Sequence, residues 1–318
     1  MTEPLTMAPI VAENLVRHFG DVEAVNGIDL QVNAGEIFGF LGPNGAGKST
    51  VVRMLTTLLR PTSGKAFVAG FDVAKHPNEV RQRIGVALQD AAIDPLMTGV
   101  ELLRLQAVLY SIPKSKMKSR ADELLERVGL TAAADRRVGT YSGGMRRRLD
   151  LALSLIHQPT VLFLDEPTTG LDPMSRVSLW EEVRRLNNEG TTVMLTTQYL
   201  EEADQLADRI AIIDKGVIVR EGKPQELKAS VGFPTLVINV SRDQHELAKS
   251  ILMGFGDLRP TAEGTLGVGL RGGAEAVTDV VRKLDESSIR VQHLELNEPS
   301  LDDVFAEATG HRLEGAQQ

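Results

Sequence analysis

One short glycine-rich stretch carries a lysine and two hydroxyl side chains at a spacing suited to phosphate binding. It reads Gly42-Pro43-Asn44-Gly45-Ala46-Gly47-Lys48-Ser49-Thr50 and fits the pattern G-x-x-x-x-G-K-[ST]. Glycine adopts backbone conformations that side chains forbid, so successive N–H groups can turn toward one anion. In such a loop the lysine reaches the β- and γ-phosphates of a nucleotide, and the serine hydroxyl binds Mg²⁺. The stretch predicts a phosphate site; the alternative is a glycine-rich turn that binds nothing.

Two acids, Asp165 and Glu166, follow directly on the apolar run Val161-Leu162-Phe163-Leu164. A fully apolar run of this length is typical of a central parallel strand, and ligands in parallel sheets bind beyond the carboxyl ends of the strands. Adjacent residues point in different directions, so we expect different roles. Asp165 would hold Mg²⁺, and Glu166 would act as general base toward an attacking water. The alternative is an acidic pair that stabilises a helix N-terminus.

Three further positions could contact the same ligand, each with a plainer alternative. Gln89 follows a predicted buried strand and could offer its amide oxygen to a metal or a water, or be a solvated loop residue. Phe19 could stack on an adenine base or be an ordinary core residue. Ser142-Gly143-Gly144-Met145 starts a predicted helix and could bind an anion, or Ser142 could simply cap that helix. The basic triplet that follows, Arg146 to Arg148, is interpreted as a solvated helix face.

The elements that must position these residues follow from periodicity. Short apolar runs at residues 37–41, 84–88, 161–164 and 191–197 predict strands, and residues 48–55 predict a helix. From about residue 90 to residue 158 the pattern is helical. The fold class predicted is α/β: a mixed sheet with a phosphate loop and a helical insertion over residues 90–158, within a first domain of residues 1–230.

Residues 233–310 are predicted to form a second domain. Their strand and helix patterns follow the order βαββαβ, which indicates a small α+β, ferredoxin-like fold, and Ser300 is expected to cap a closing helix. The segment contains no obvious chemistry. A structural or dimer-stabilising role is favoured over ligand sensing.

Composition narrows the class of protein. The chain has 318 residues, a net charge of −8 and no cysteine. An acidic chain does not neutralise phosphates in general, so nucleic acid is not expected as a partner. There is no signal-peptide pattern and no run of about 18 apolar residues, so any membrane role is expected to come through a partner protein. The absence of cysteine fits a cytosolic protein.

The order of these motifs resembles the ATP-binding subunit of ABC transporters over about residues 8–230. The resemblance rests on the set Gly42 to Thr50, Gln89, Ser142-Gly143-Gly144, Asp165-Glu166 and Asp172. Within the family the chain is most similar to the daunorubicin-resistance type of drug-export ATPase. That narrower resemblance rests on Tyr141 to Met145 with the arginine triplet and on Thr168-Thr169-Gly170-Leu171-Asp172-Pro173.

The resemblance implies roles by position. Phe19 matches the aromatic residue that stacks on adenine, and Gln89 matches the glutamine that senses Mg²⁺ and the attacking water. Ser142 to Met145 match the signature that closes over ATP held by a second subunit, and Asp172 matches a loop that crosses the dimer interface. ATP and Mg²⁺ are the implied cofactors.

The resemblance also implies partners and a reaction. They are a second copy of the chain and a separate integral membrane permease, with the chain at the cytoplasmic face of the membrane. The implied function is ATP hydrolysis that powers export of a drug-like, antibiotic or lipid-like compound. A soluble ABC ATPase without a transport role is the alternative.

Two departures from the family pattern bear on activity. Tyr141 and Met145 replace the leucine and glutamine that usually flank the signature. Gln198 stands where the family usually has a histidine against the γ-phosphate, so it takes a candidate catalytic role. An amide donates a hydrogen bond but carries no proton or charge near neutral pH. A low-turnover, regulatory ATP-binding module is therefore a second alternative.

Overall fold

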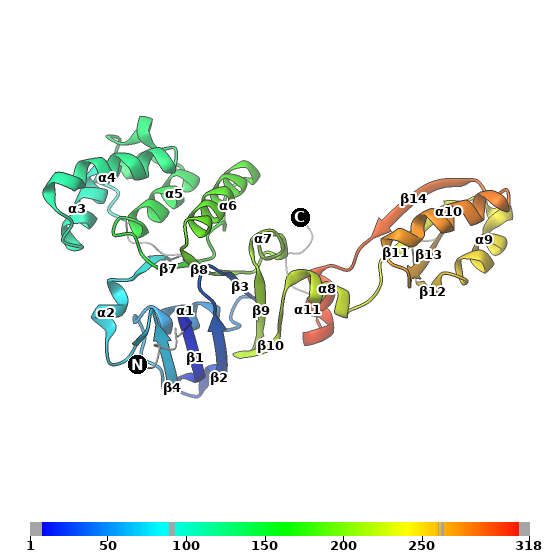
Figure 1. The fold of residues 1–318 in the computed structure, drawn as a ribbon, viewed down its shortest axis with the longest axis horizontal. Helices are drawn as coiled ribbons and strands as arrows, with labels where there is room; N and C mark the ends of the chain where they lie inside the picture. Colours follow the sequence, from blue (N-terminus) through cyan, green and yellow to red (C-terminus); the bar gives the residue numbers. More distant parts are fainter. Residues whose placement is uncertain (1–7, 89–92, 260, 262–263, 312–318) are drawn as a thin grey trace, which may run out of the picture. The chain divides into compact units, whose positions relative to one another are not determined.

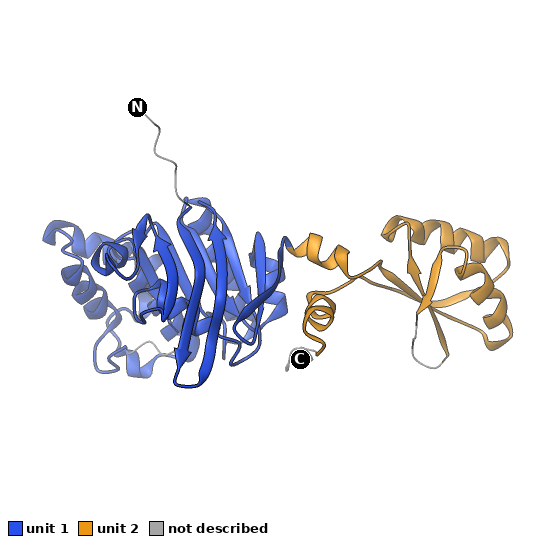
Figure 2. Cartoon of the chain, turned by 90° about the horizontal axis from the view of Figure 1, so that it is seen from below, with its two compact units in different colours: residues 1–223, 313–318 blue, residues 224–312 orange. Residues whose placement is uncertain are grey.

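The computed structural model describes residues 8–88, 93–259, 261 and 264–311 (Figure 1). The chain divides into two compact units between Lys223 and Pro224, shown in two colours in Figure 2. Among the described residues, no helix is both long enough and apolar enough to cross a bilayer.

A six-stranded sheet forms the centre of the first unit, in the order β10-β9-β3-β8-β7-β6. Its strands are β3 (Ile37–Leu41), β6 (Ile84–Ala87), β7 (Val161–Asp165), β8 (Thr192–Thr197), β9 (Arg209–Asp214) and β10 (Val217–Gly222). All neighbours pair parallel except β10 with β9. Along β7 the side chains alternate between two cores: Phe163 packs on one face and Leu164 on the other. Burial on both faces explains why the run is continuously apolar.

A second, antiparallel sheet lies across the first helix, in the order β2-β1-β4-β5. Its strands are β1 (Ile10–Phe19), β2 (Val22–Val32), β4 (Ser63–Val68) and β5 (Phe71–Asp72). Helix α1 (Lys48–Leu55) shares one hydrophobic cluster with both sheets, for example through Met54, Leu15 and Phe40. The helix that follows the phosphate loop is therefore held between two sheets.

Helices cover the other face of the central sheet (Figure 1). They are α3 (Gly99–Leu109), α4 (Lys114–Arg127), α5 (Gly143–Ser154), α6 (Pro173–Asn188) and α7 (Leu200–Leu206), while the short α2 (Pro77–Arg81) precedes β6. The helical insertion is present, with Thr98 and Glu101 forming a capping box at the start of α3. The α/β fold class with its helical insertion is confirmed.

The second unit contains a four-stranded antiparallel sheet in the order β12-β13-β11-β14. Its elements are β11 (Thr235–Val240), α9 (His245–Leu252), β12 (Gly256–Arg259), β13 (Thr265–Leu270), α10 (Val277–Glu286), β14 (Val291–Asn297) and α11 (Leu301–Thr309). The βαββαβ order agrees with the ferredoxin-like prediction. Both α9 and α10 pack on one face, where Leu236, Val268 and Leu284 are fully buried. Ser300 caps α11 through a capping box with Asp303.

The boundary between the two domains differs from the sequence-based prediction. Helix α8 (Pro224–Ser230) was expected in the first domain, whereas the structure groups it with the second unit. The reason is tertiary: α8 packs against α11, which lies more than seventy residues later in the chain. A contact of that sequence separation leaves no local signal.

Asp150 is a buried carboxyl group on α5. Burial raises its pKa from the ordinary 3.8 to about 7, and the guanidinium of Arg147, 3.7 Å away, opposes that rise. Its Oδ2 atom accepts no hydrogen bond. The folded protein therefore binds a proton at Asp150 over a pH range in which the unfolded chain has released it.

We expect this group to make stability depend on pH. A carboxyl whose folded pKa is raised contributes stability below the unfolded pKa, and that contribution is lost as pH rises through about 7. Each full pH unit between the two pKa values is worth about 1.4 kcal/mol. The uncharged variant Asp150→Asn should therefore gain stability relative to the wild type between pH 4 and 7, and the gain should level off above pH 7. Melting temperatures of both proteins across that range test this, and a difference independent of pH would contradict it.

Candidate active site

The predicted site residues lie at the ends of neighbouring parallel strands. Leu41 of β3 pairs with Thr197 of β8, and Asp165 of β7 pairs with Thr196 of β8. The phosphate loop, Gln198 and the acidic pair therefore leave the sheet at one edge, where α/β proteins bind ligands. Gln89 follows β6 but falls outside the described residues.

The phosphate loop has the glycines that its path requires. Gly45 and Gly47 have φ values of 81° and 107°, in the left-handed region that favours glycine. A Cβ atom on Gly42 would lie 2.3 Å from the carbonyl oxygen of Ile213. Gly47 is the N-cap of α1 and offers no side-chain cap, so the first N–H groups of the helix are free to bind an anion.

Lys48 and Glu166 meet inside the protein. The Nζ atom of Lys48 lies 3.4 Å from Oε1 of Glu166 and donates to the carbonyl oxygens of Gly42 and Pro43 at 2.7 and 3.0 Å. The lysine is only 4% exposed. Burial lowers its pKa below the ordinary 10.5, while the carboxylate of Glu166 raises it. Structure thus brings together two residues that lie more than a hundred positions apart in the sequence.

Ser49 and Asp165 form the oxygen-rich part of the site. The Oγ atom of Ser49 donates to Oδ1 of Asp165 at 3.2 Å, and Thr196 Oγ1 donates to the same oxygen at 2.5 Å. A hydroxyl and a carboxylate are ligands suited to Mg²⁺, which takes few protein oxygens and keeps waters and phosphate oxygens. The free N–H groups of α1, the buried Lys48 and this oxygen pair fit a nucleotide with its metal.

Glu166 occupies a left-handed backbone conformation, with φ at 48°. Its N–H donates to the carbonyl and hydroxyl oxygens of Thr196, both at 3.1 Å. Its Oε2 atom accepts a hydrogen bond from Thr169 Oγ1 at 3.2 Å. A non-glycine residue at positive φ persists where surrounding contacts impose it, and such positions cluster at functional sites.

Two of the candidates reach the surface of the first unit. Phe19 is the last residue of β1 and is 46% exposed, so the alternative of a core phenylalanine is wrong. The guanidinium of Arg17 lies 4.5 Å from the centroid of its ring. Gln198 lies between β8 and α7, and the N-cap of α7 is the next residue, Tyr199, without a side-chain cap. Gln198 therefore is not the residue that caps α7.

The signature residues lie at the start of α5. Ser142 is the N-cap, and its Oγ accepts from the N–H of Met145 at 3.2 Å, as the capping alternative required. Ser142 and Gly143 are exposed. A Cβ atom on Gly144 would lie 3.1 Å from Ser175 Oγ, which places the signature beside the start of α6.

Asp172 is the exposed N-cap of α6. Its carboxylate accepts from the N–H and the hydroxyl of Ser175 at 3.0 and 2.6 Å, and these bonds lower its pKa. No hydrogen bond or ion pair joins the described side chains of Ser142 or Asp172 to those of the phosphate loop. These two groups therefore form an exposed surface separate from the Lys48–Glu166 pair.

Sequence reasoning missed two residues of this site, Thr196 and Arg147. Thr196 has the local signal of a hydroxyl at the end of a buried strand. The interpretation of the arginine triplet as a solvated face is wrong for Arg147 and Arg148, whose guanidinium groups donate to backbone carbonyls inside the first unit. Only Arg146 is exposed. No local pattern distinguishes the three.

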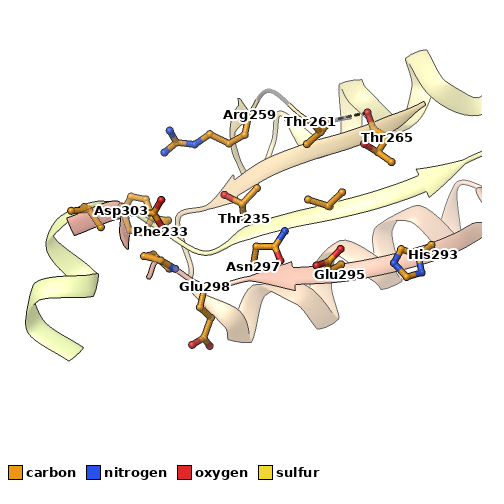
Figure 3. A pocket seen from close by; sticks show the side chains of 14 residues that line it. Phe233, Thr235, Arg259, Thr261, Thr265, His293, Glu295, Asn297, Glu298 and Asp303 are labelled. Carbon is orange, nitrogen blue, oxygen red and sulfur yellow. Dashed lines mark hydrogen bonds between the residues drawn. The ribbon is translucent and has the colours of Figure 1, made fainter. Parts of the chain in front are cut away.

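The second unit has a hollow of about 840 Å³ on the sheet face opposite α9 and α10. Figure 3 shows His293, Glu295 and Asn297 along β14, with Thr235 on β11 beside them. Its lining includes none of the phosphate-loop residues and neither member of the acidic pair. This hollow therefore belongs to no part of the active site described above.

Comparisons with known proteins agree with this geometry. Residues 25–169 match the family described as "ABC transporter", and residues 222–309 match "ATP-binding protein DrrA1-3-like, C-terminal domain". The chain is 48% identical to the daunorubicin resistance ATP-binding protein DrrA2 of Streptomyces coeruleorubidus, over 96% of each chain. It is 47% identical to the daunorubicin/doxorubicin resistance ATP-binding protein DrrA of Streptomyces peucetius, over 95% of this chain and 92% of that protein.

Solved structures have a similar fold over much of the chain. A dimeric ATP-binding cassette, MJ0796, bound to ADP and phosphate is similar with a TM-score of 0.63 and 25% identity, covering 67% of this chain and 98% of that one. Nucleotide binding and ATP hydrolysis follow from membership of the family, whose ATP-binding subunits dimerise and work with membrane permeases. The chain belongs to the ATP-binding subunits of ABC transporters, in the group that resembles the daunorubicin-resistance proteins.

Proposed function

We propose that the chain is the ATP-hydrolysing subunit of an export system for a drug-like, antibiotic or lipid-like compound. It would work as a homodimer at the cytoplasmic face of the membrane, bound to a separate permease. The observation that carries the proposal is the meeting of Lys48, Ser49, Asp165 and Glu166 at one sheet edge. Near full-length similarity to drug-resistance ATP-binding proteins supports the choice of cargo class.

The contacts of these residues support a division of roles. ATP brings negative phosphates to the free N–H groups of α1, where Lys48 would exchange Glu166 for the phosphates as its partner. Mg²⁺ would be held by Ser49 and Asp165, with Gln89 as a further oxygen donor. Glu166, released from the lysine, would accept a proton from the attacking water. Phe19 would stack on the adenine ring.

The exposed residues would complete the site in a dimer. Ser142 to Met145 and Asp172 would meet the nucleotide and the interface of the second copy. The exposure of Ser142, Gly143 and Asp172 in one copy is what such a role requires. The Oγ atom of Ser142 accepts from the N–H of Met145, whereas the N–H groups of Gly143 and Gly144 are the first of the helix and could bind an anion.

ATP affinity should depend on Lys48. Lys48→Ala removes a buried charge-assisted donor, which is worth about 1.5–3 kcal/mol, or roughly ten- to a hundredfold in affinity. Titration with a fluorescent ATP analogue measures this. Lys75→Ala is the matched control, because Lys75 is exposed and forms an ion pair with Asp72, three residues earlier. Equal affinity of Lys48→Ala and the control would exclude the phosphate role.

The rate of ATP hydrolysis should depend on Glu166, whereas ATP binding should not. Glu166→Gln keeps the shape but removes the base, so we expect ATP binding to persist and an ATP-bound dimer to accumulate, with turnover lowered by at least about a hundredfold. Asp165→Asn should instead weaken the dependence on Mg²⁺. Phosphate release and size-exclusion chromatography with ATP are the measurements, with exposed Glu181→Gln as control. Wild-type turnover in Glu166→Gln would refute the assignment.

Transport can be tested in cells by comparing the wild-type protein with Glu166→Gln. The chain is co-expressed with a candidate membrane permease, and accumulation of the fluorescent compound daunorubicin is followed. Lower accumulation with the wild type than with Glu166→Gln supports drug export. Equal accumulation alongside normal ATP hydrolysis would argue against daunorubicin as cargo.

The role of Gln198 distinguishes an efficient ATPase from the alternative of a low-turnover, regulatory ATP-binding module. If its amide donates a neutral hydrogen bond to the γ-phosphate, Gln198→Ala should lower turnover on the order of ten- to a thousandfold. Gln198→His should change the rate and introduce a titration near the ordinary histidine pKa of about 6.5. Rate against pH from 6 to 8 measures both. Unchanged turnover per folded protein in Gln198→Ala would show that this side chain does not meet the nucleotide.

A further inference from the structure

Arg147 extends from α5 into the edge of the central sheet, and its side chain is only 12% exposed. Its guanidinium donates to four backbone carbonyl oxygens. The acceptors are Leu88 at 2.6 Å, Asp165 at 2.5 Å, Glu166 at 2.8 Å and Pro167 at 3.0 Å. Three of these acceptors are the acidic pair and the residue after it, and the fourth precedes Gln89. One side chain thus joins α5 to the two segments that carry predicted catalytic groups.

Only arginine can make this set of contacts. Its planar guanidinium carries five N–H donors in a fixed fork, whereas lysine has three donors on one atom and glutamine has two. Burial lowers the pKa of Arg147, while the carboxylates of Asp150 and Asp165 raise it. The carboxyl group of Asp150 lies 3.7 Å from the Nη1 atom of Arg147. The Arg147 side chain is therefore held in place by several hydrogen-bond acceptors and is not a freely solvated surface arginine.

The backbone at Glu166 explains what this contact achieves. Glu166 has φ at 48°, a conformation that persists in a non-glycine residue only where neighbours impose it. Thr196 holds the N–H of Glu166, and Arg147 holds its carbonyl oxygen and the next one. The peptide groups on both sides of Glu166 are therefore fixed, which sets the direction of its carboxylate toward Lys48.

We propose that Arg147 is a positioning residue for ATP hydrolysis. It holds the left-handed turn at Glu166 and ties this turn both to the segment before Gln89 and to the helix that begins with the signature residues. Loss of Arg147 frees the turn to relax, and the carboxylate of Glu166 moves from the position in which it faces the phosphate loop. The inference rests on the proposed role of Glu166 as the base.

The neighbouring arginines provide a matched comparison. Arg148 is also partly buried and donates to one carbonyl oxygen, that of Val128 at 3.0 Å. It touches neither the acidic pair nor the segment before Gln89. Arg148→Gln therefore removes a buried guanidinium–carbonyl bond from the same helix without disturbing the turn at Glu166.

The test measures turnover and ATP affinity separately in full-length Arg147→Gln, Arg147→Lys and Arg148→Gln. A misplacement of a reacting group by about 1 Å costs about a hundredfold in rate. We expect Arg147→Gln to lower kcat by about that factor while ATP affinity changes less than about threefold. The kcat of Arg147→Lys should lie between those of Arg147→Gln and the wild type, because lysine keeps the positive charge and part of the hydrogen bonding. Arg148→Gln should keep the wild-type kcat.

A double variant distinguishes positioning from a loss of structure. When Glu166→Gln has already removed the base, adding Arg147→Gln should change the residual turnover by less than about threefold, since the group that Arg147 positions is gone. A further loss as large as in the wild-type background would overturn the proposal, as would a wild-type kcat in folded Arg147→Gln. Unfolding of both Arg147 variants would show a structural role and overturn it too. Wild-type turnover in Glu166→Gln alone would instead refute the assigned base.

Discussion

Strands β3, β8 and β7 run parallel and end together, with Leu41 opposite Thr197 and Asp165 opposite Thr196. This register determines where the residues that follow each strand lie. A shift of one position would turn Asp165 to the opposite face of the sheet, because side chains alternate along a strand. The register is fixed by burial on both faces, since each strand contributes side chains to two hydrophobic clusters. Chemistry at the edge thus depends on packing within the sheet.

Charge is the second constraint on this edge. Two cations, Lys48 and Arg147, and two anions, Asp165 and Glu166, are largely withdrawn from water near this edge of the sheet. Buried charges are tolerated when they are paired and hydrogen-bonded. Lys48 faces the carboxylate of Glu166, whereas Arg147 binds the backbone oxygens of the same turn. The two cations therefore act on different parts of one residue.

Gln198 follows β8 at this edge, at the position where the family resemblance implies a histidine. A histidine titrates near neutral pH, whereas the amide of glutamine does not. Asp150 is the contrasting case on α5, where burial brings the pKa of a carboxyl to about 7.

The amino-acid sequence by itself determined the elements and the chemical types. Residues 42–50 and the pair Asp165-Glu166 are local patterns, and the continuous apolar run before the pair reports burial on both faces. The second unit was also predictable, because its βαββαβ order follows from short-range periodicity. Such features are set by neighbours in sequence, through backbone conformation and side-chain alternation.

Tertiary structure alone decided which groups meet. The contact between Lys48 and Glu166, the convergence of Ser49 and Thr196 on Asp165, and the membership of α8 in the second unit all join distant segments. Arg147 is the clearest example, since three successive arginines look alike in sequence and only the packing of α5 directs one of them to the turn at Glu166. Helix rotation and sheet register set these contacts, and both result from burying apolar surface over the whole unit rather than from any local pattern.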